Sequence, residues 1–340
     1  MKKLINDPKN VVEEMIDGYV KAHPEYVKQM EENERSLITA QTLAKGKVGV
    51  LIGGGSGHEP AFMGYVGKGM ADACAVGNIF ASPPPAPIQE ATKAIDQGAG
   101  VVYLYGNYAG DVMNFGMAAE MADLEDDIQV EMVVATDDVA SAPKAEKEKR
   151  RGIAGEFFVY KAAGAAADQG YNLEGVARIA RKANENTRSM GVGLSPCSLP
   201  QTGEPSFELG ENEMEIGLGH HGEPGLEKGP IEQADIVADR LLKDIFEDMP
   251  IEKGDKVAVL VNGLGSTPRM ELYIMFRRVE QVLEEKGITI HRSYVGDYIT
   301  SLEMGGCSIT LMKLDDELTK AVDHPVDTPM FVQNKGGRTK

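Results

Sequence analysis

The chain has 340 residues, with 35 Lys and Arg against 53 Asp and Glu, and a formal net charge of −18. This acidity excludes general affinity for nucleic-acid backbones and anionic membranes, and no apolar run approaches the roughly 18 residues of a membrane span. At roughly 150 residues per domain, the length predicts two domains, and a hydrophobic content of 42% is enough for their cores.

The cysteines and the N-terminal residues indicate the cellular compartment. Cys74, Cys197 and Cys307 are few, scattered and odd in number, which favours a reducing compartment without a disulfide framework. The first residues become polar at once and contain no signal-peptide core. We therefore expect a cytoplasmic protein.

Glycine is in excess, with 39 residues, which is about 11% of the chain against a usual ~7%. The glycines collect where short apolar runs end, and not in a low-complexity tract. Because glycine lets a backbone approach a ligand closely, this placement is a first indication of ligand-binding loops.

In chain order, the sequence first predicts a capped amphipathic helix. Asn6, Asp7 and Pro8 form a helix-start signal, and apolar residues then recur at helical spacing as far as Val20. Short buried strands alternate with helices from there on, which is typical of an α/β sheet. The predicted strands cover residues 47–52, 100–105 and 130–135. The predicted helices cover residues 88–97, 113–124 and 157–169.

A helix predicted over residues 172–189 leads out of this first part, and we place a domain boundary between residues 185 and 186. Strands are then predicted over residues 190–194, 214–218, 256–261, 289–295 and 308–313. Helices are predicted over residues 231–246 and 269–286. The predicted fold class is α/β, with two α/β domains, 1–185 and 186–335, each a mixed sheet flanked by helices. Residues 145–151 form a charge run, predicted to be a solvated loop or helix end, and residues 336–340 form a predicted unpacked tail.

Residues 53–60, Gly-Gly-Gly-Ser-Gly-His-Glu-Pro, follow the first of these strands directly. Successive glycines can present backbone N–H donors to a small polar ligand. The segment is not a P-loop, because no Gly-Lys-Ser/Thr follows, and His58 takes the place of the third glycine of a dinucleotide fingerprint. A purely structural turn is the alternative, but the histidine favours a binding loop.

Asp111 ends a second glycine-containing segment, residues 106–111, which also follows a predicted strand. Ligands of open α/β sheets bind at the carboxyl ends of strands. Asp111 is therefore a candidate general base, and its alternative role is to cap the following helix.

His220 and His221 lie in a third glycine-rich segment, residues 214–225. Adjacent side chains of an extended chain point to opposite sides, so we do not expect these two to chelate one metal. His-x-x-x-His spacing is also absent, and we predict no metal site. One of the two can act as a nucleophile toward carbonyl carbon. The alternatives are a solvated turn histidine and a metal-dependent hydrolase.

Gly-His-Glu-Pro and His-Gly-Glu-Pro occur once each, in different predicted domains. This pairing predicts a site built between the domains. The remaining histidines are assigned structural or surface roles, and the cysteines lack the basic neighbours of a catalytic thiol. Those histidines are His23, His291 and His324.

Taken together, the motifs resemble the dihydroxyacetone-binding subunit of the bacterial dihydroxyacetone kinases. The matching stretches follow one another over almost the whole chain. They are MKKLIND, GGGSGHEP, GNYAGDVMNF, EMEIGLGHHGEPG, VNGLGSTP and SLEMGGCSITLMKLDDE. The resemblance implies a two-domain α/β homodimer with the substrate, dihydroxyacetone or a similar short ketose, bound between the domains.

The resemblance also implies residue roles. His221 would form a covalent hemiaminal with the ketone carbon, His58 would hydrogen-bond the bound substrate, and Asp111 would be the base for the hydroxyl that accepts phosphate. His220 takes no catalytic role. The implied substrate contacts in the glycine-rich segment are Gly54, Gly55, Ser56 and Gly57.

The same resemblance implies that this chain binds no cofactor of its own. Nucleotide and Mg²⁺ would belong to a separate nucleotide-binding kinase subunit, recharged by a phosphotransferase-system phosphodonor subunit or, in other versions, by ATP. The chain itself is consistent with this division, because it has no P-loop and its acidic composition supplies few cations for a phosphoryl group.

Gly106 is a departure from the family pattern, since many relatives carry lysine immediately before the Asn-Tyr of this motif. A lysine there would contact the substrate or the incoming phosphoryl group. Its replacement makes a larger ketose such as erythrulose an alternative substrate. A non-catalytic ketose-binding coactivator of transcription is a further alternative, although the retention of Asp111 favours catalysis.

Overall fold

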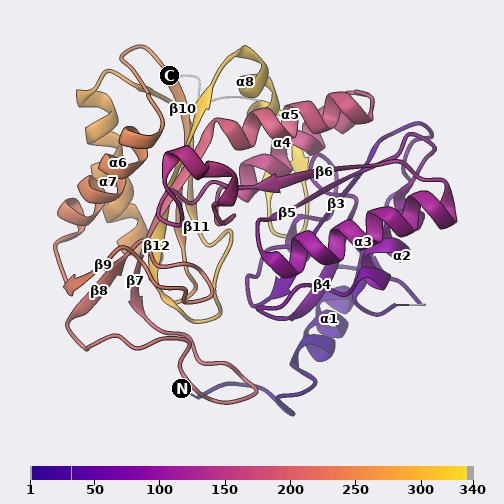
Figure 1. Ribbon diagram of the computed structural model, residues 1–340, viewed down its shortest axis with the longest axis horizontal. Helices are drawn as coiled ribbons and strands as arrows, with labels where there is room; N and C mark the ends of the chain where they lie inside the picture. The colour runs from indigo at the N-terminus through magenta and orange to yellow at the C-terminus, as the bar shows by residue number, and fades with distance from the viewer. Residues whose placement is uncertain (1, 32, 335–340) are drawn as a thin grey trace.

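The computed structural model describes residues 2–31 and 33–334. Within them, two six-stranded sheets are flanked by helices and lie next to each other (Figure 1). The predicted α/β fold class is confirmed. No helix among the described residues is long and apolar enough to cross a membrane. The tail predicted for residues 336–340 lies outside the described residues.

The first sheet has the strand order β1-β2-β4-β3-β5-β6. The neighbouring strands β4, β3, β5 and β6 run parallel to one another. At one edge, β2 pairs antiparallel with both β1 and β4. The strands are β1 (Val27–Gln29), β2 (Ser36–Thr39), β3 (Gly49–Ser56), β4 (Ala73–Ile79), β5 (Val101–Gly106) and β6 (Val130–Ala135). Its helices are α1 (Val11–Ala22), α2 (Pro85–Ile95), α3 (Ala109–Asp126), α4 (Glu156–Asp168) and α5 (Leu173–Glu185).

The second sheet has the order β11-β10-β12-β7-β8-β9 and is antiparallel except for the pair β10 and β11. Helices α6 (Ala234–Asp248) and α7 (Arg269–Glu285) cover its outer face (Figure 1). The strands are β7 (Thr187–Ser195), β8 (Glu213–Ile216), β9 (Glu227–Pro230), β10 (Lys256–Gly263), β11 (Thr289–Gly296) and β12 (Gly305–Leu314).

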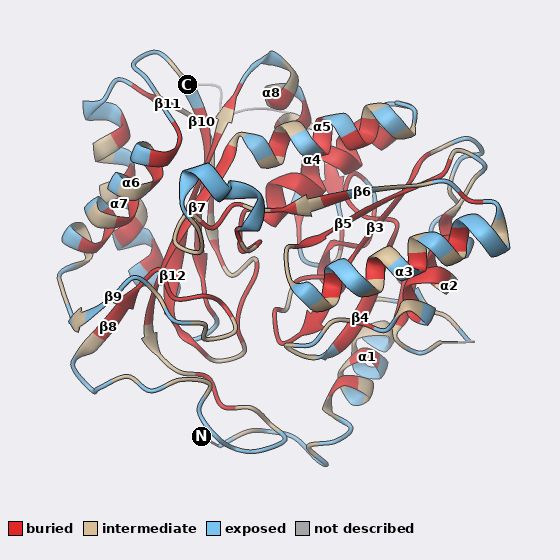
Figure 2. Ribbon diagram, viewed as in Figure 1, coloured by how far each residue is buried: buried red, intermediate tan, exposed pale blue. Residues whose placement is uncertain are grey.

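Helix α4 lies between the two sheets and is buried over 12 of its 13 residues (Figure 2). Alternation along the strands explains this position: Val50 and Ile52 of β3 face α4, whereas Leu51 packs with α2 and α3. From the second sheet, the ring of Tyr294 approaches that of Phe157 with centroids 5.3 Å apart. One apolar core therefore continues from the first sheet through α4 to the second. The boundary predicted between residues 185 and 186 stays a prediction.

The C-terminal segment returns to the same core. Helix α8 (Asp316–Asp323) is followed by the short strands β13 (Val326–Asp327) and β14 (Val332–Gln333). Leu318 and Phe331 from this segment are buried in the core that contains α4. This last part of the chain thus closes over the junction of the two sheets.

The glycine-rich segment differs from its prediction as a loop, because β3 continues through Ser56. The reason is close packing within the sheet. A Cβ at Gly53 would lie 2.5 Å from the carbonyl oxygen of Ala75, and a Cβ at Gly55 would lie 2.6 Å from the nitrogen of Ala81. Glycine is required here because neighbouring backbone comes too near for any side chain.

The prediction of a wholly solvated charge run at residues 145–151 is wrong at its C-terminal end. Arg150 is 1% exposed, and its guanidinium makes two hydrogen bonds of 2.9 and 2.6 Å to the Asp248 carboxylate on α6. Arg188 of β7 binds the same carboxylate. The charges of Arg150 and Asp248 are therefore buried as a paired group that ties the segment before α4 to α6.

We expect Asp248→Asn to lower the free energy of unfolding by about 3–5 kcal/mol, because it leaves two buried guanidinium groups without their counter-charge. Denaturant unfolding monitored by circular dichroism measures this change. Asp239→Asn is the matched control, since Asp239 lies on the same helix but forms an exposed pair with Arg278 and should cost less than about 1 kcal/mol. Equal stability of the two variants would contradict the expectation.

Candidate active site

A small cavity lies where loops from both sheets meet. The first sheet contributes residues from the carboxyl ends of β3 and β5 and from the starts of α3 and α4. The second contributes the turn after β8 and the segment after β11. The lining residues are Gly53, Gly54, Gly55, His58, Phe62, Gly106, Tyr108, Asp111, Glu156, His220, His221 and Ile299. His58, Asp111 and His221, each predicted from its own motif, thus come together with Gly54 and Gly55.

Ser56 and Gly57, also predicted to contact substrate, are placed elsewhere. The Ser56 hydroxyl donates a 2.7 Å hydrogen bond to the Gly77 carbonyl oxygen inside the sheet. The Gly57 N–H donates to the Glu59 carboxylate. Both residues line a separate, apolar pocket that is closed by the N-terminal segment and Leu302. The hydrogen bonds of both residues are thus made away from the cavity.

His221 is held at both of its ring nitrogens. Nδ1 lies 3.0 Å from Glu223 Oε1, and the His221 backbone N–H donates to Glu223 Oε2 at 3.0 Å. Nε2 lies 3.0 Å from Nε2 of His58. The Nδ1 of His58 lies 2.7 Å from the Thr300 carbonyl oxygen. A continuous hydrogen-bonded chain therefore runs from Glu223 through both imidazoles to the backbone.

The electrostatics of this chain fix where its protons lie. Burial, and secondarily the charge of His221, lower the pKa of His58 to about 3, so that ring is neutral. Burial tends to raise the pKa of Glu223, but the hydrogen bond and charge of His221, together with Arg151, hold it at about 2. The Thr300 carbonyl can only accept, so His58 donates from Nδ1 and accepts at Nε2. His221 therefore donates to His58 from Nε2, and its Nδ1 faces the Glu223 carboxylate.

His220 lies against the same two rings, so the expectation that adjacent histidines diverge is wrong. Its ring centroid is 4.5 Å from that of His58 and 4.6 Å from that of His221. The tight Gly-rich turn, with Gly217 and Gly222 at positive φ, gives the two neighbours a geometry unlike that of an extended strand. Burial holds the pKa of His220 well below its usual value, and its Nε2 lies 3.0 Å from the Tyr108 hydroxyl.

The three imidazoles could in principle hold a metal ion, since one ligand nitrogen from each lies within 4.8 Å of the others. Five of the six ring nitrogens, however, already have hydrogen-bond partners: Thr300, Glu223, Tyr108 and the His58–His221 pair. Metal binding would require several of these bonds to break. The arrangement suits proton transfer and attack on a carbonyl carbon better than metal ligation.

Asp111 lies in the first turn of α3, where Tyr108 is the N-cap residue. The alternative that Asp111 serves only as the helix cap is therefore not supported. Its Oδ1 is buried without a hydrogen-bond partner, which is costly unless a ligand supplies one. Burial raises the pKa of Asp111 to about 6 against the opposing effects of Ser82 and His221. Asp111 thus offers the cavity an unpaired acceptor that ionises near neutral pH.

Sequence reasoning missed Tyr108 and Glu156 as lining residues. Tyr108 donates to the Gly152 carbonyl oxygen at 3.0 Å and orients His220. Glu156 is the first residue of α4, a place where an acidic side chain is ordinarily read as a favourable partner of the helix dipole. The sequence does carry a signal for Glu156. It is the one carboxylate of the run EFFVYKAAGAAA, and this run is too hydrophobic for a surface helix.

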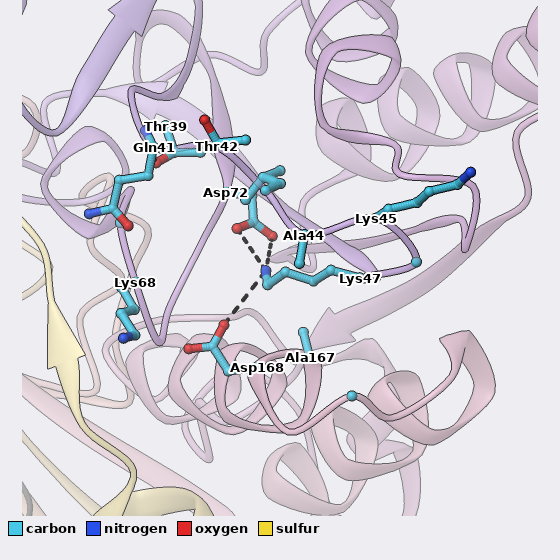
Figure 3. Close-up of a pocket in the computed structure, with 14 residues that line it drawn as sticks. Thr39, Gln41, Thr42, Ala44, Lys45, Lys47, Lys68, Asp72, Ala167 and Asp168 are labelled. Carbon is cyan, nitrogen blue, oxygen red and sulfur yellow. Dashed lines mark hydrogen bonds and ion pairs between the residues drawn. The ribbon is translucent and has the colours of Figure 1, made fainter.

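A larger cavity of about 480 Å³ lies near the start of β3 (Figure 3). Its centre is Lys47, whose Nζ is 2.7 Å from Asp72 Oδ1 and 3.8 Å from Asp168 Oδ1. Figure 3 shows Lys45 pointing away from this group. Because the central charges, those of Lys47, Asp72 and Asp168, already bind one another, we place the chemistry at the histidine cluster.

The known proteins similar to this chain share one family. A family model described as the Dak1 domain matches residues 17–330. A Listeria innocua protein named the dihydroxyacetone-binding subunit DhaK of PTS-dependent dihydroxyacetone kinase 2 is 52% identical over 331 residues, covering 97% of this chain and 99% of that protein. A D-erythrulose kinase of Mycolicibacterium smegmatis is 44% identical, covering 97% of this chain but 56% of its own length.

The fold has a solved counterpart as well. The crystal structure of the dihydroxyacetone kinase of C. freundii superimposes with a TM-score of 0.89 at 33% sequence identity. The match covers 98% of this chain and 60% of the C. freundii chain. This chain is therefore similar in extent to the separate Listeria subunit and to part of the longer kinases.

Proposed function

This chain belongs to the Dak1 domain family, and on that premise we propose that it is the dihydroxyacetone-binding subunit of a dihydroxyacetone kinase. It captures a short ketose covalently on His221 and presents a hydroxyl for phosphorylation. The observation that carries the proposal is the convergence in one cavity of the hydrogen-bonded His58–His221 pair and the unpaired Asp111 oxygen. The three residues provide a nucleophile, a proton carrier and a base.

Capture begins at His221 Nε2, the atom hydrogen-bonded to His58 in the free protein. As the ketose enters, the Nε2 proton of His221 passes by way of His58 Nε2 to the carbonyl oxygen. In the same step the Nε2 lone pair of His221 forms an N–C bond with the carbonyl carbon, and the C=O π electrons move to that oxygen. The product is a hemiaminal whose Nδ1 faces the Glu223 carboxylate. Plain polyols such as glycerol lack the carbonyl and are not captured.

The captured ketose then presents a terminal hydroxyl to Asp111. Above its pKa of about 6 the Asp111 carboxylate accepts a hydrogen bond from this hydroxyl and removes its proton as the oxygen attacks phosphorus. The covalent link to His221 holds the hydroxyl in place, so orientation is secured before the phosphoryl donor arrives.

The phosphoryl donor and its cations are proposed to come from another chain. The described residues that line the cavity include neither lysine nor arginine, whereas phosphoryl transfer needs positive charge around the moving group. We therefore assign nucleotide and Mg²⁺ to a nucleotide-binding subunit, recharged by a phosphoenolpyruvate-dependent phosphotransferase-system protein. The homodimer and the cytoplasmic location remain proposals of the same kind.

A reconstituted phosphorylation assay tests this function. We expect dihydroxyacetone phosphate to form only when the nucleotide-binding subunit and phosphodonor are supplied, while this chain alone gains the mass of one ketose. Erythrulose, run in parallel, reports substrate preference. Capture by the chain alone should survive EDTA, since no metal takes part in it.

Two outcomes would contradict the proposal in different ways. Ketose capture without turnover of either substrate, in the presence of active partner subunits, would indicate a ketose-binding coactivator. Absence of capture by dihydroxyacetone, erythrulose and related short ketoses would exclude ketose binding altogether. Loss of capture in EDTA would favour a metal site at the three histidines.

A further inference from the structure

Glu156 is a buried carboxyl in the wall of the active-site cavity that the capture and base steps do not use. Glu156 is 3% exposed, and its side chain lines the cavity together with Gly106, Asp111 and His221. One carboxyl oxygen, Oε2, accepts a hydrogen bond from the Tyr160 hydroxyl one helical turn along α4. The other, Oε1, is turned toward Gly106 and Gly152.

The backbone around Glu156 is built to receive this oxygen. A Cβ at Gly152 would lie 2.5 Å from Oε1, and a Cβ at Gly106 would overlap the same atom. The carboxyl therefore occupies space that opens only because both positions are glycine. Asp137 fixes the entry to α4, since its carboxylate accepts hydrogen bonds from the N–H groups of Ile153 and Gly155 at 3.0 and 2.8 Å.

The charges around Glu156 favour its neutral form. Burial raises its pKa well above the usual value, and the nearby carboxylates of Asp137 and Asp111 raise it further, against the hydrogen bond from Tyr160. The described ion pairs include no cation paired with Glu156. Because Tyr160 donates to Oε2, Oε1 is the oxygen of the neutral carboxyl that can carry the proton and donate on the side of Gly106.

We propose that Glu156 is a substrate-contacting residue, which donates a hydrogen bond from Oε1 to an oxygen of the bound ketose. This inference rests on the proposed function, and it assigns to the cavity a neutral donor opposite the Asp111 acceptor. Two carboxyl groups in one site then have different tasks, one as a base and one as a donor. A donor without charge, in a cavity whose described lining includes neither lysine nor arginine, fits an uncharged polyhydroxy ketone and disfavours ketoacids and ketose phosphates.

The competing interpretation is that Glu156 only fills space and holds Tyr160. Three substitutions separate the possibilities. Glu156→Gln keeps the size, accepts from Tyr160 through its carbonyl and offers an N–H₂ donor on the other side. Glu156→Met keeps the bulk but offers no donor. Tyr160→Phe removes the hydrogen bond within α4 and leaves the carboxyl.

We expect the dissociation constants for dihydroxyacetone and erythrulose to stay within about threefold of wild type in Glu156→Gln and Tyr160→Phe. In Glu156→Met both should rise about tenfold or more, because a ketose oxygen is left buried without its donor. Titration calorimetry and intact-protein mass measure binding and capture. Thermal unfolding confirms that each variant is folded.

An infrared spectrum gives a second readout that does not depend on affinity. The wild-type protein should show the C=O stretch of a protonated carboxyl that is absent in Glu156→Gln and shifts when ketose binds. Wild-type affinity in Glu156→Met, or absence of this band, would overturn the inference. Equal losses in Glu156→Gln and Glu156→Met would show that the site needs an anion, which also overturns it.

The same experiments distinguish failure of the proposed function from failure of the role of Glu156. If wild-type protein captures no ketose, the proposed function fails and the role of Glu156 falls with it. If wild-type protein captures ketose and the three variants bind it equally well, the function stands and only the role of Glu156 is excluded.

Discussion

Replacing His221 with alanine should abolish the covalent adduct and reduce ketose phosphorylation at least about a hundredfold. The variant removes the atom that forms the N–C bond, and with it the fixed position of the hydroxyl next to Asp111. Misplacement of a reacting group by about 1 Å can already cost a factor of 10². Intact-protein mass with and without dihydroxyacetone measures the adduct, and the reconstituted assay measures the rate.

His291→Asn is a matched control for this substitution. His291 also pairs with a carboxylate, Asp323, at 3.0 Å, but it does not line the cavity. It should therefore capture ketose as wild type does. Persistence of the adduct in His221→Ala would mean that His58 or His220 is the nucleophile, and the assignment from hydrogen-bond geometry would be wrong.

Asp111→Asn is expected to separate capture from transfer. The adduct on His221 should still form, while phosphorylation should fall by about 10²–10⁴, the usual contribution of a positioned base. Folding should not suffer, because Asp111 Oδ1 makes no hydrogen bond and the amide oxygen of asparagine can still accept from Ser82. Adduct mass, the rate of ketose phosphate formation and thermal unfolding together test these three statements.

The dependence of the rate on pH gives the same residue a second signature. Because burial raises the pKa of Asp111 to about 6, the active carboxylate form is lost as the pH falls through that value. The wild-type rate should therefore decline below about pH 6 and level off above it. Asp123→Asn, an exposed substitution on the same helix, should keep this profile. A similar inflection in Asp111→Asn would assign the titration to another group.

The sequence predicts which motif residues come together better than it predicts the course of the backbone around them. His58, Asp111 and His221 each follow a strand-like apolar run, and the rule that ligands bind at strand ends correctly brings them together. The end of β3 at Ser56 could not be found in the same way. A run of glycines signals a turn when read alone, whereas here it permits close packing between neighbouring strands.

Buried charges are the other feature that local patterns conceal. Arg150 lies at the end of a run of exposed charges, and only the distant Asp248 explains why it is buried. Glu156 is likewise defined by Gly106, which precedes it by 50 residues. Charge and hydropathy windows report the neighbours along the chain, and both of these partners come from elsewhere in the fold.

The position of α4 between the sheets has a consequence for how the chain can be divided. Side chains of α4 belong to a core shared by both sheets, so a break between residues 185 and 186 would leave apolar side chains of the second sheet uncovered. A fragment of that kind is prone to self-association. We therefore expect the two halves to fold only as one chain, and either half expressed alone to fold incompletely.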